Sequence, residues 1–174
     1  MNRPNIYIVR HGEKADGENM PLTKRGRKQA ELLAKRLKKL EISKIYSSDL
    51  ERCKETAEII KRQIKIPIVF EKALREVPSA VKEQPKKYKK EMKIIKKFWE
   101  KVHKEQGKIL LVGSGIVNRI LLSFALKIDP QKAHFMQHPT GLTRIERVEE
   151  RKRYRVWHMN DTSHLSDKLM IMQK

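Results

Sequence analysis

Short apolar runs alternate with longer segments of helical periodicity along this chain. The runs at residues 6–9, 42–46, 67–70 and 109–112 have the length of buried strands and are bounded by polar, proline or glycine residues. Between most of them, apolar side chains recur every three or four residues, as on the buried face of an amphipathic helix. This alternation predicts an α/β fold, a three-layer α/β/α sandwich with a mostly parallel sheet.

The predicted helices begin at residues that can cap them. Thr23 precedes a segment that is apolar on one face as far as about residue 40, and Asp49 precedes a second such segment. A further helix is expected after Gly113-Ser114-Gly115, ending near residue 126.

Two late runs, 142–148 and 154–159, predict a hairpin that adds an antiparallel strand at the sheet edge. No internal repeat and no domain boundary is visible in the sequence. We therefore expect residues 1–174 to form a single domain.

The net charge of +20, from 41 Lys+Arg against 21 Asp+Glu, is compatible with a polyanionic partner. A simpler interpretation is that the excess Lys and Arg residues form a solvated surface. Residues 82–108 hold eleven lysines and four glutamates, with Met92, Ile95, Trp99 and Val102 at helical spacing. Aromatic residues are not interleaved with the basic ones, so we do not expect dedicated nucleic-acid binding. The positive field should instead attract anionic substrates.

Several classes of protein are disfavoured by what the sequence lacks. Cys53 is the single cysteine, so no internal disulfide can form, and no Cys/His spacing indicates a metal site. The longest apolar stretch, 120–126, is far shorter than the ~18 residues of a membrane span, and no leader pattern is visible. We expect a cytoplasmic protein with no membrane partner; the sequence leaves its oligomeric state open.

Chemistry-bearing residues follow three of the predicted strands. The first strand ends in Arg10-His11-Gly12, the second is followed by residues 47–52, and the fourth by residues 113–115. Imidazole can attack phosphorus, guanidinium can hold two phosphate oxygens, and glycine lets backbone N–H groups approach an anion. Because the carboxyl ends of parallel strands meet at one edge of the sheet, these loops predict one phosphate pocket.

At these positions the chain resembles the histidine phosphatase superfamily, also called phosphoglycerate mutase-like. The similarity runs in the family's order through nearly the whole chain. The matching residues are Arg10-His11-Gly12-Glu13, Leu22-Thr23 with Gly26 and Gln29-Ala30, Ser47-Ser48-Asp49-Leu50 with Arg52 and Thr56-Ala57, Leu74-Arg75-Glu76, 109–122 with Arg119, and Thr140-Gly141-Leu142-Thr143. The short length and the late Asn160-Asp161-Thr162 are closer to the small phosphatase branch than to the mutases.

The resemblance implies a role for each matched residue. His11 would be the nucleophile that forms a phosphohistidine, and Arg10 and Arg52 would clamp the phosphate oxygens. Glu76 would protonate the leaving oxygen and later help to activate water. No metal or other cofactor is implied, because arginines and histidines supply the positive charge.

These assignments have plainer alternatives. Arg52 lies on a basic helix and is compatible with solvated surface, while Glu71 and Glu83 lie near Glu76 in the sequence. Cys53 is expected to be a buried small side chain. Glu13 and Asn19, in the loop after the first strand, are further candidates for substrate contact.

Ser114 departs from the family pattern, which has a second histidine in this turn. With Gly115, it is expected to contact phosphate, or simply to cap the following helix. Three explanations are compatible with it: a weakened or non-catalytic member that binds phosphorylated ligands, an enzyme in which another group compensates, and an active phosphatase with an engineered replacement. We expect a phosphomonoesterase impaired in this chain, acting on a phosphorylated small molecule or phosphoprotein. A non-catalytic phosphate- or phosphoprotein-binding module is the alternative.

Overall fold

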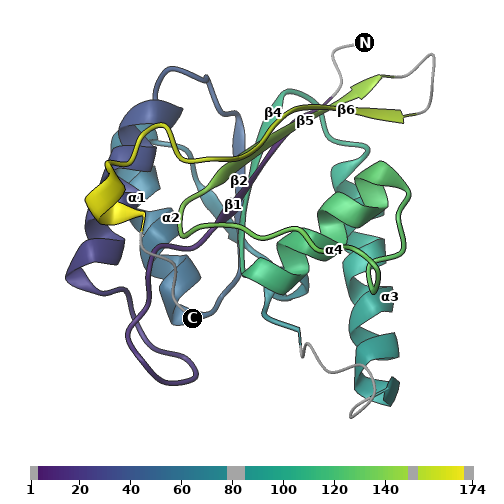
Figure 1. Cartoon of the computed structure of the whole chain (residues 1–174). Helices are drawn as coiled ribbons and strands as arrows, with labels where there is room; N and C mark the ends of the chain where they lie inside the picture. The colour runs from purple at the N-terminus through teal and green to yellow at the C-terminus, as the bar shows by residue number, and fades with distance from the viewer. Residues whose placement is uncertain (1–3, 78–84, 149–152, 171–174) are drawn as a thin grey trace.

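A six-stranded mixed sheet with helices on both faces forms the molecule. The computed structural model describes residues 4–77, 85–148 and 153–170 (Figure 1). Glu83, named above as an alternative to Glu76, lies outside these ranges. The elements are β1 (Asn5–Arg10), α1 (Lys24–Leu37), β2 (Lys44–Ser47), α2 (Glu51–Ile64), β3 (Ile68–Phe70), η1 (Lys72–Leu74), α3 (Pro85–Val102), β4 (Lys108–Gly113), α4 (Gly115–Leu126), β5 (Leu142–Val148), β6 (Arg153–Asp161) and η2 (Asp167–Leu169).

The sheet has the order β3-β2-β4-β1-β5-β6. The first four strands are parallel, β5 is antiparallel to β1, and β6 returns beside β5 as the outer strand of a hairpin. The mostly parallel α/β sandwich and its late edge hairpin are therefore confirmed.

The two helical layers bury alternate residues of the same strands, as the period of two in a strand requires. Tyr7 and Val9 of β1 pack with α1 and α2, whereas Ile6 and Ile8 pack with α3 and α4. Figure 1 shows the two helix pairs on opposite sides of the sheet. No helix within the described ranges has both the length and the hydropathy to cross a membrane.

The register of the central strands brings the three chemistry-bearing loops together. Arg10 pairs with Gly113 at the end of β1 and β4, and Ser47 of β2 pairs with Val112. The loops that follow these strands therefore leave the same edge of the sheet.

Of the caps predicted for α1 and α2, that of α1 is confirmed and that of α2 is wrong. The Thr23 hydroxyl accepts a 2.9 Å hydrogen bond from the Gly26 N–H, as an N-cap should. Asp49 does not cap α2, because its carboxylate accepts two 2.6 Å hydrogen bonds from Arg75. The amide oxygen of Asn19 accepts instead from the first N–H of α2, that of Glu51, at 3.0 Å.

Candidate active site

Backbone hydrogen bonds hold together the loops that follow β1, β2 and β4. The N–H of His11 donates to the Gly113 carbonyl at 3.0 Å, and the N–H of Ser48 donates to the Val112 carbonyl at 2.9 Å. The three loops are thereby tied to the end of one central strand, β4. The predicted convergence of these loops is confirmed.

His11 is buried and held in one tautomer. Its Nδ1 lies 2.7 Å from the carbonyl oxygen of Gly12, which can only accept, so Nδ1 carries the proton. The pKa of His11 is lowered from 6.5 to about 3, mainly by burial; the Gly12 hydrogen bond opposes this shift, and the charges of Arg10, Arg52 and Lys14 add to it. The ring is therefore neutral, and Nε2 keeps a lone pair that can attack.

Arg52, in the first turn of α2, lies beside that lone pair. Its Nε–H donates to His11 Nε2 at 3.0 Å, its Nη1 donates to the Glu18 carbonyl at 3.0 Å, and its Nη2 donates to the Ser114 hydroxyl at 3.3 Å. The side chain is only 5% exposed, which rules out the solvated-surface alternative.

Arg10 supplies a second, partly buried cation. Its Nη1 donates to the Gln137 carbonyl at 2.7 Å, while its buried Nε has no hydrogen-bond partner among the described residues. Burial lowers the pKa of Arg10, the nearby charge of Arg52 lowers it too, and Glu76 opposes both. Such an arrangement leaves an N–H donor and uncompensated positive charge, which suits an anion.

Glu76 lies at the edge of this cluster. Its Oε1 accepts from the Ile116 N–H at 3.3 Å, and its Oε2 lies 3.9 Å from Nη2 of Arg52. The carboxylate is 39% exposed, so water and a substrate leaving group can both reach it. Glu71, the nearby alternative, pairs instead with Lys101 at 3.1 Å.

Ser114 is fully buried beneath the cluster. It occupies the N-cap position of α4, but its side chain makes no capping hydrogen bond. The hydroxyl accepts from Arg52 instead. Next to it, a Cβ built on Gly115 would lie 3.7 Å from Arg10 Nε, so the start of α4 is close to both arginines. A helix N-terminus beside two arginines favours negative charge.

Glu13 and Asn19 have structural partners. The Glu13 carboxylate accepts from the Thr23 hydroxyl at 2.7 Å and pairs with Arg25, which lowers the pKa of Glu13. Asn19 caps α2 as described above. Contact of either side chain with substrate stays a prediction.

Two residues that support the site carried no assigned role in the sequence. Thr56 accepts from the Gly12 N–H at 3.1 Å and donates to the Arg52 carbonyl at 2.7 Å. Gln137, whose carbonyl holds Arg10, is itself fixed by side-chain hydrogen bonds with Asn118 and Thr143. Thr56 stands within a matching motif, but no local pattern marks Gln137, because it lies so far from Arg10 in the chain.

Within the described ranges, neither a reactive thiol nor a metal cluster accompanies the site. Burial raises the pKa of Cys53 to about 12, so its thiol stays protonated, as expected for a buried small side chain. Among the described residues, no group of three or more His, Cys, Asp or Glu side chains is arranged to hold a metal ion. A neutral histidine beside two guanidinium groups is suited to binding and attacking a phosphate ester.

Comparison with known proteins places this geometry in a family. The model of the histidine phosphatase superfamily (branch 1) matches residues 6–101. Curated relatives named "probable phosphoglycerate mutase GpmB", including that of Escherichia coli K12, are 41% identical over 87 residues. That match covers 45% of this chain and only 40% of the relative's length.

Solved structures share the fold over nearly the whole chain. Bacillus stearothermophilus YhfR superposes with a TM-score of 0.75 at 24% identity, covering 92% of this chain and 98% of that one. A mycobacterial glucosyl-3-phosphoglycerate phosphatase gives a TM-score of 0.75 at 19% identity, covering 91% and 98%. With a family match over more than half of its residues, the chain belongs to the histidine phosphatase superfamily, branch 1.

Proposed function

We propose that this chain is a phosphomonoesterase that needs no metal and acts through a phosphohistidine on His11. The observation that carries the proposal is the neutral, buried imidazole with its Nε2 lone pair beside Arg52. The unpartnered N–H of Arg10 adds a second donor for the same phosphate. Two guanidinium groups then supply the positive charge that stabilises the transferring phosphoryl group.

The reaction has two steps. Nε2 of His11 attacks phosphorus, the bond from phosphorus to the ester oxygen breaks, and Glu76 gives a proton to the departing oxygen. Water then attacks the phosphohistidine while the Glu76 carboxylate accepts a proton from it. The phosphorus–nitrogen bond breaks, inorganic phosphate leaves, and neutral His11 and protonated Glu76 are restored. The position of Glu76, exposed at the edge of the arginine pair, supports both proton transfers.

The substrate class we propose is a phosphorylated small molecule. The structural neighbour named as a glucosyl-3-phosphoglycerate phosphatase supports this class. A phosphoprotein is the alternative substrate class.

We infer that Ser114 stands where the family has a second histidine, and that it slows turnover. Its hydroxyl contacts Arg52, but it can neither carry positive charge nor reach as far as imidazole. Losing one preorganised donor of this kind typically costs roughly 10²–10³-fold in rate. This same observation favours a second candidate function, a phosphate-binding module that does not turn over.

Hydrolysis of p-nitrophenyl phosphate separates the two functions. The assay compares the chain itself with His11→Ala, Ser114→His and the size-matched control Ser114→Asn, each checked for folding by circular dichroism. We expect slow hydrolysis by the chain, none by His11→Ala, and a gain of roughly 10²-fold for Ser114→His but not for Ser114→Asn.

Two outcomes would change the conclusion. If no variant turns over while phosphate still binds in isothermal titration calorimetry and His11→Ala weakens that binding, the chain is a binding module. If His11→Ala hydrolyses the ester as fast as the unmodified chain, the phosphohistidine mechanism is wrong.

A further inference from the structure

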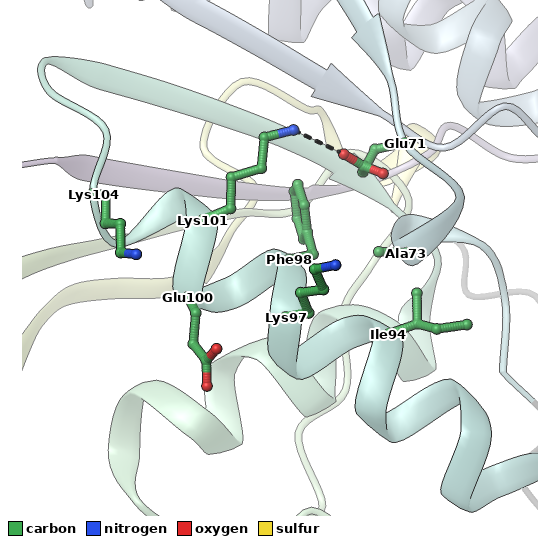
Figure 2. A pocket seen from close by; sticks show the side chains of 8 residues that line it. All are labelled: Glu71, Ala73, Ile94, Lys97, Phe98, Glu100, Lys101 and Lys104. Carbon is green, nitrogen blue, oxygen red and sulfur yellow. Dashed lines mark hydrogen bonds and ion pairs between the residues drawn. The ribbon is translucent and has the colours of Figure 1, made fainter.

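A second concave surface lies on α3, outside the site described above. It is a groove of about 650 Å³ between the C-terminal half of α3 and the segment that follows β3 (Figure 2). We call it the α3 groove. Its lining consists of Glu71, Ala73, Ile94, Lys97, Phe98, Glu100, Lys101 and Lys104.

The α3 groove is preformed, with an apolar floor and apolar side chains left open to solvent. Phe98 is buried and packs edge-on against Tyr46, with ring centroids 5.4 Å apart. Ile94 is 39% exposed, and Val69 of the edge strand β3, which pairs with Tyr46 and so lies on the same face of the sheet as Phe98, is 40% exposed. Exposed apolar side chains gathered beside a groove mark a contact surface.

Lysines form the rim of this floor. Lys101 is engaged by Glu71 at 3.1 Å, the ion pair drawn in Figure 2. Lys97 and Lys104 have no ion-pair partner in the part of the chain that the structure describes. Two free ammonium groups beside an apolar floor complement a segment that carries both carboxylates and apolar side chains.

We propose that the α3 groove is a docking site for an acidic, amphipathic segment of another protein. Its apolar side chains would lie on the floor at Ile94 and Phe98, and its carboxylates would pair with Lys97 and Lys104. A second copy of this chain does not fit, because each copy carries a net charge of +20. A nucleic-acid strand fits less well, because the Phe98 ring is too buried to stack with a base.

The α3 groove is connected to the candidate active site through a short segment. Glu71 lines the groove, η1 follows, and Glu76 of the active site comes next in the chain. The proposal does not depend on the proposed function, because docking is measured without turnover. If the chain is an enzyme, a docked partner lies beside the segment that carries its general acid.

The test measures binding of a short fluorescent peptide in which glutamates alternate with leucines. The groove variant is K97E/K104E, and the matched control is K35E/K39E, which reverses two exposed lysines at the end of α1 on the other face of the sheet. Both change the net charge equally and neither breaks an ion pair of the described residues. We expect affinity to fall about tenfold or more for K97E/K104E and to stay within about twofold for K35E/K39E.

The apolar part of the proposal has its own variant and probes. Ile94→Asp should weaken binding of the same peptide, and a peptide with serines in place of the leucines should bind the unmodified chain weakly. Thermal midpoints of all variants verify folding.

Three results would overturn the proposal. Equal losses in K97E/K104E and K35E/K39E mean that only net charge attracts the peptide. Equal binding of the serine peptide means that the apolar floor is unused. Tighter, groove-dependent binding of a single-stranded oligonucleotide or of anionic phospholipid vesicles assigns the surface to a nucleic acid or to a membrane.

Discussion

The Nε–H of Arg52 donates a 3.0 Å hydrogen bond to Nε2 of His11, so a guanidinium engages the lone pair that would attack phosphorus. If a phosphate oxygen accepts the hydrogen bond from this N–H in place of His11, the lone pair of Nε2 becomes free to attack. In the proposed mechanism, substrate binding would therefore activate the nucleophile in one event at Arg52.

Arg52→Lys should separate charge from geometry. Lysine keeps the positive charge but cannot contact His11, Ser114 and a phosphate through one planar group. We expect phosphate affinity, measured by isothermal titration calorimetry, to fall at least about tenfold. Arg27→Lys, at an exposed arginine paired with Glu55 outside the site, is the control and should bind normally. Unchanged affinity in Arg52→Lys would mean that the geometry of the guanidinium is unimportant.

Thr56 should be a positioning residue that holds His11 and Arg52 in register. Thr56→Val keeps the shape but leaves the buried Gly12 N–H without its partner, a loss of about 1–3 kcal/mol in the free energy of unfolding. Thr56→Ser keeps the hydroxyl and should recover most of that loss. Chemical denaturation measures both variants, and equal stability of Val and Ser would contradict the role.

The buried His11 and the partly buried His164 should make the fold sensitive to acid. The pKa of His11 is lowered to about 3 and that of His164 to about 4, in both cases mainly by burial. In the unfolded chain both would take up protons near pH 6.5, so the unfolded state binds more protons below that pH. Stability should therefore fall as the pH drops from about 6.5 towards 4.

Thermal midpoints across this range test the effect. His11→Gln cannot take up the proton, so its midpoint should fall less steeply with acid than that of the unmodified chain. The same slope in both proteins would show that His11 does not contribute. A nitrogen-15 spectrum at about pH 5 should still show the neutral ring of His11 in the folded protein.

Gly26 should be intolerant of any side chain because the loop after His11 packs against it. A Cβ at this position would lie 2.0 Å from the Glu13 carbonyl oxygen, which is backbone and cannot swing away. Gly26→Ala should cost about 1–3 kcal/mol of stability, the usual cost of overpacking. At Gly115 the nearest atom to a new Cβ is Arg10 Nε at 3.7 Å, so Gly115→Ala should leave the denaturation midpoint nearly unchanged. Similar losses in both variants would rule out this steric explanation.

Most of the fold could be predicted from local sequence patterns. Apolar runs and periodicity predicted the strands and helices, and Thr23 was recognisable as a cap because its partner, Gly26, is close in the chain. Asp49 was misassigned because its actual partner, Arg75, lies beyond a helix and a strand. Cap rules cannot anticipate a distant guanidinium that competes for the same carboxylate.

The candidate site, too, could be predicted only where local patterns determine it. Arg10, His11 and Arg52 come together because parallel strands align their ends, which a strand pattern can predict. Gln137 holds Arg10 through a backbone carbonyl, an interaction that leaves no trace in the identity of the residue. Such a contact can be found only in three dimensions.

The partly buried Arg10 and the buried Arg52 together have a thermodynamic consequence for the whole chain. Each guanidinium has lost water, and the two charges repel each other. An oxyanion that binds between them in the folded state alone would offset this cost, raising the free energy of unfolding by RT ln(1 + [L]/Kd). The melting temperature should therefore rise with phosphate concentration, so that thermal unfolding alone reports whether the ligand is bound.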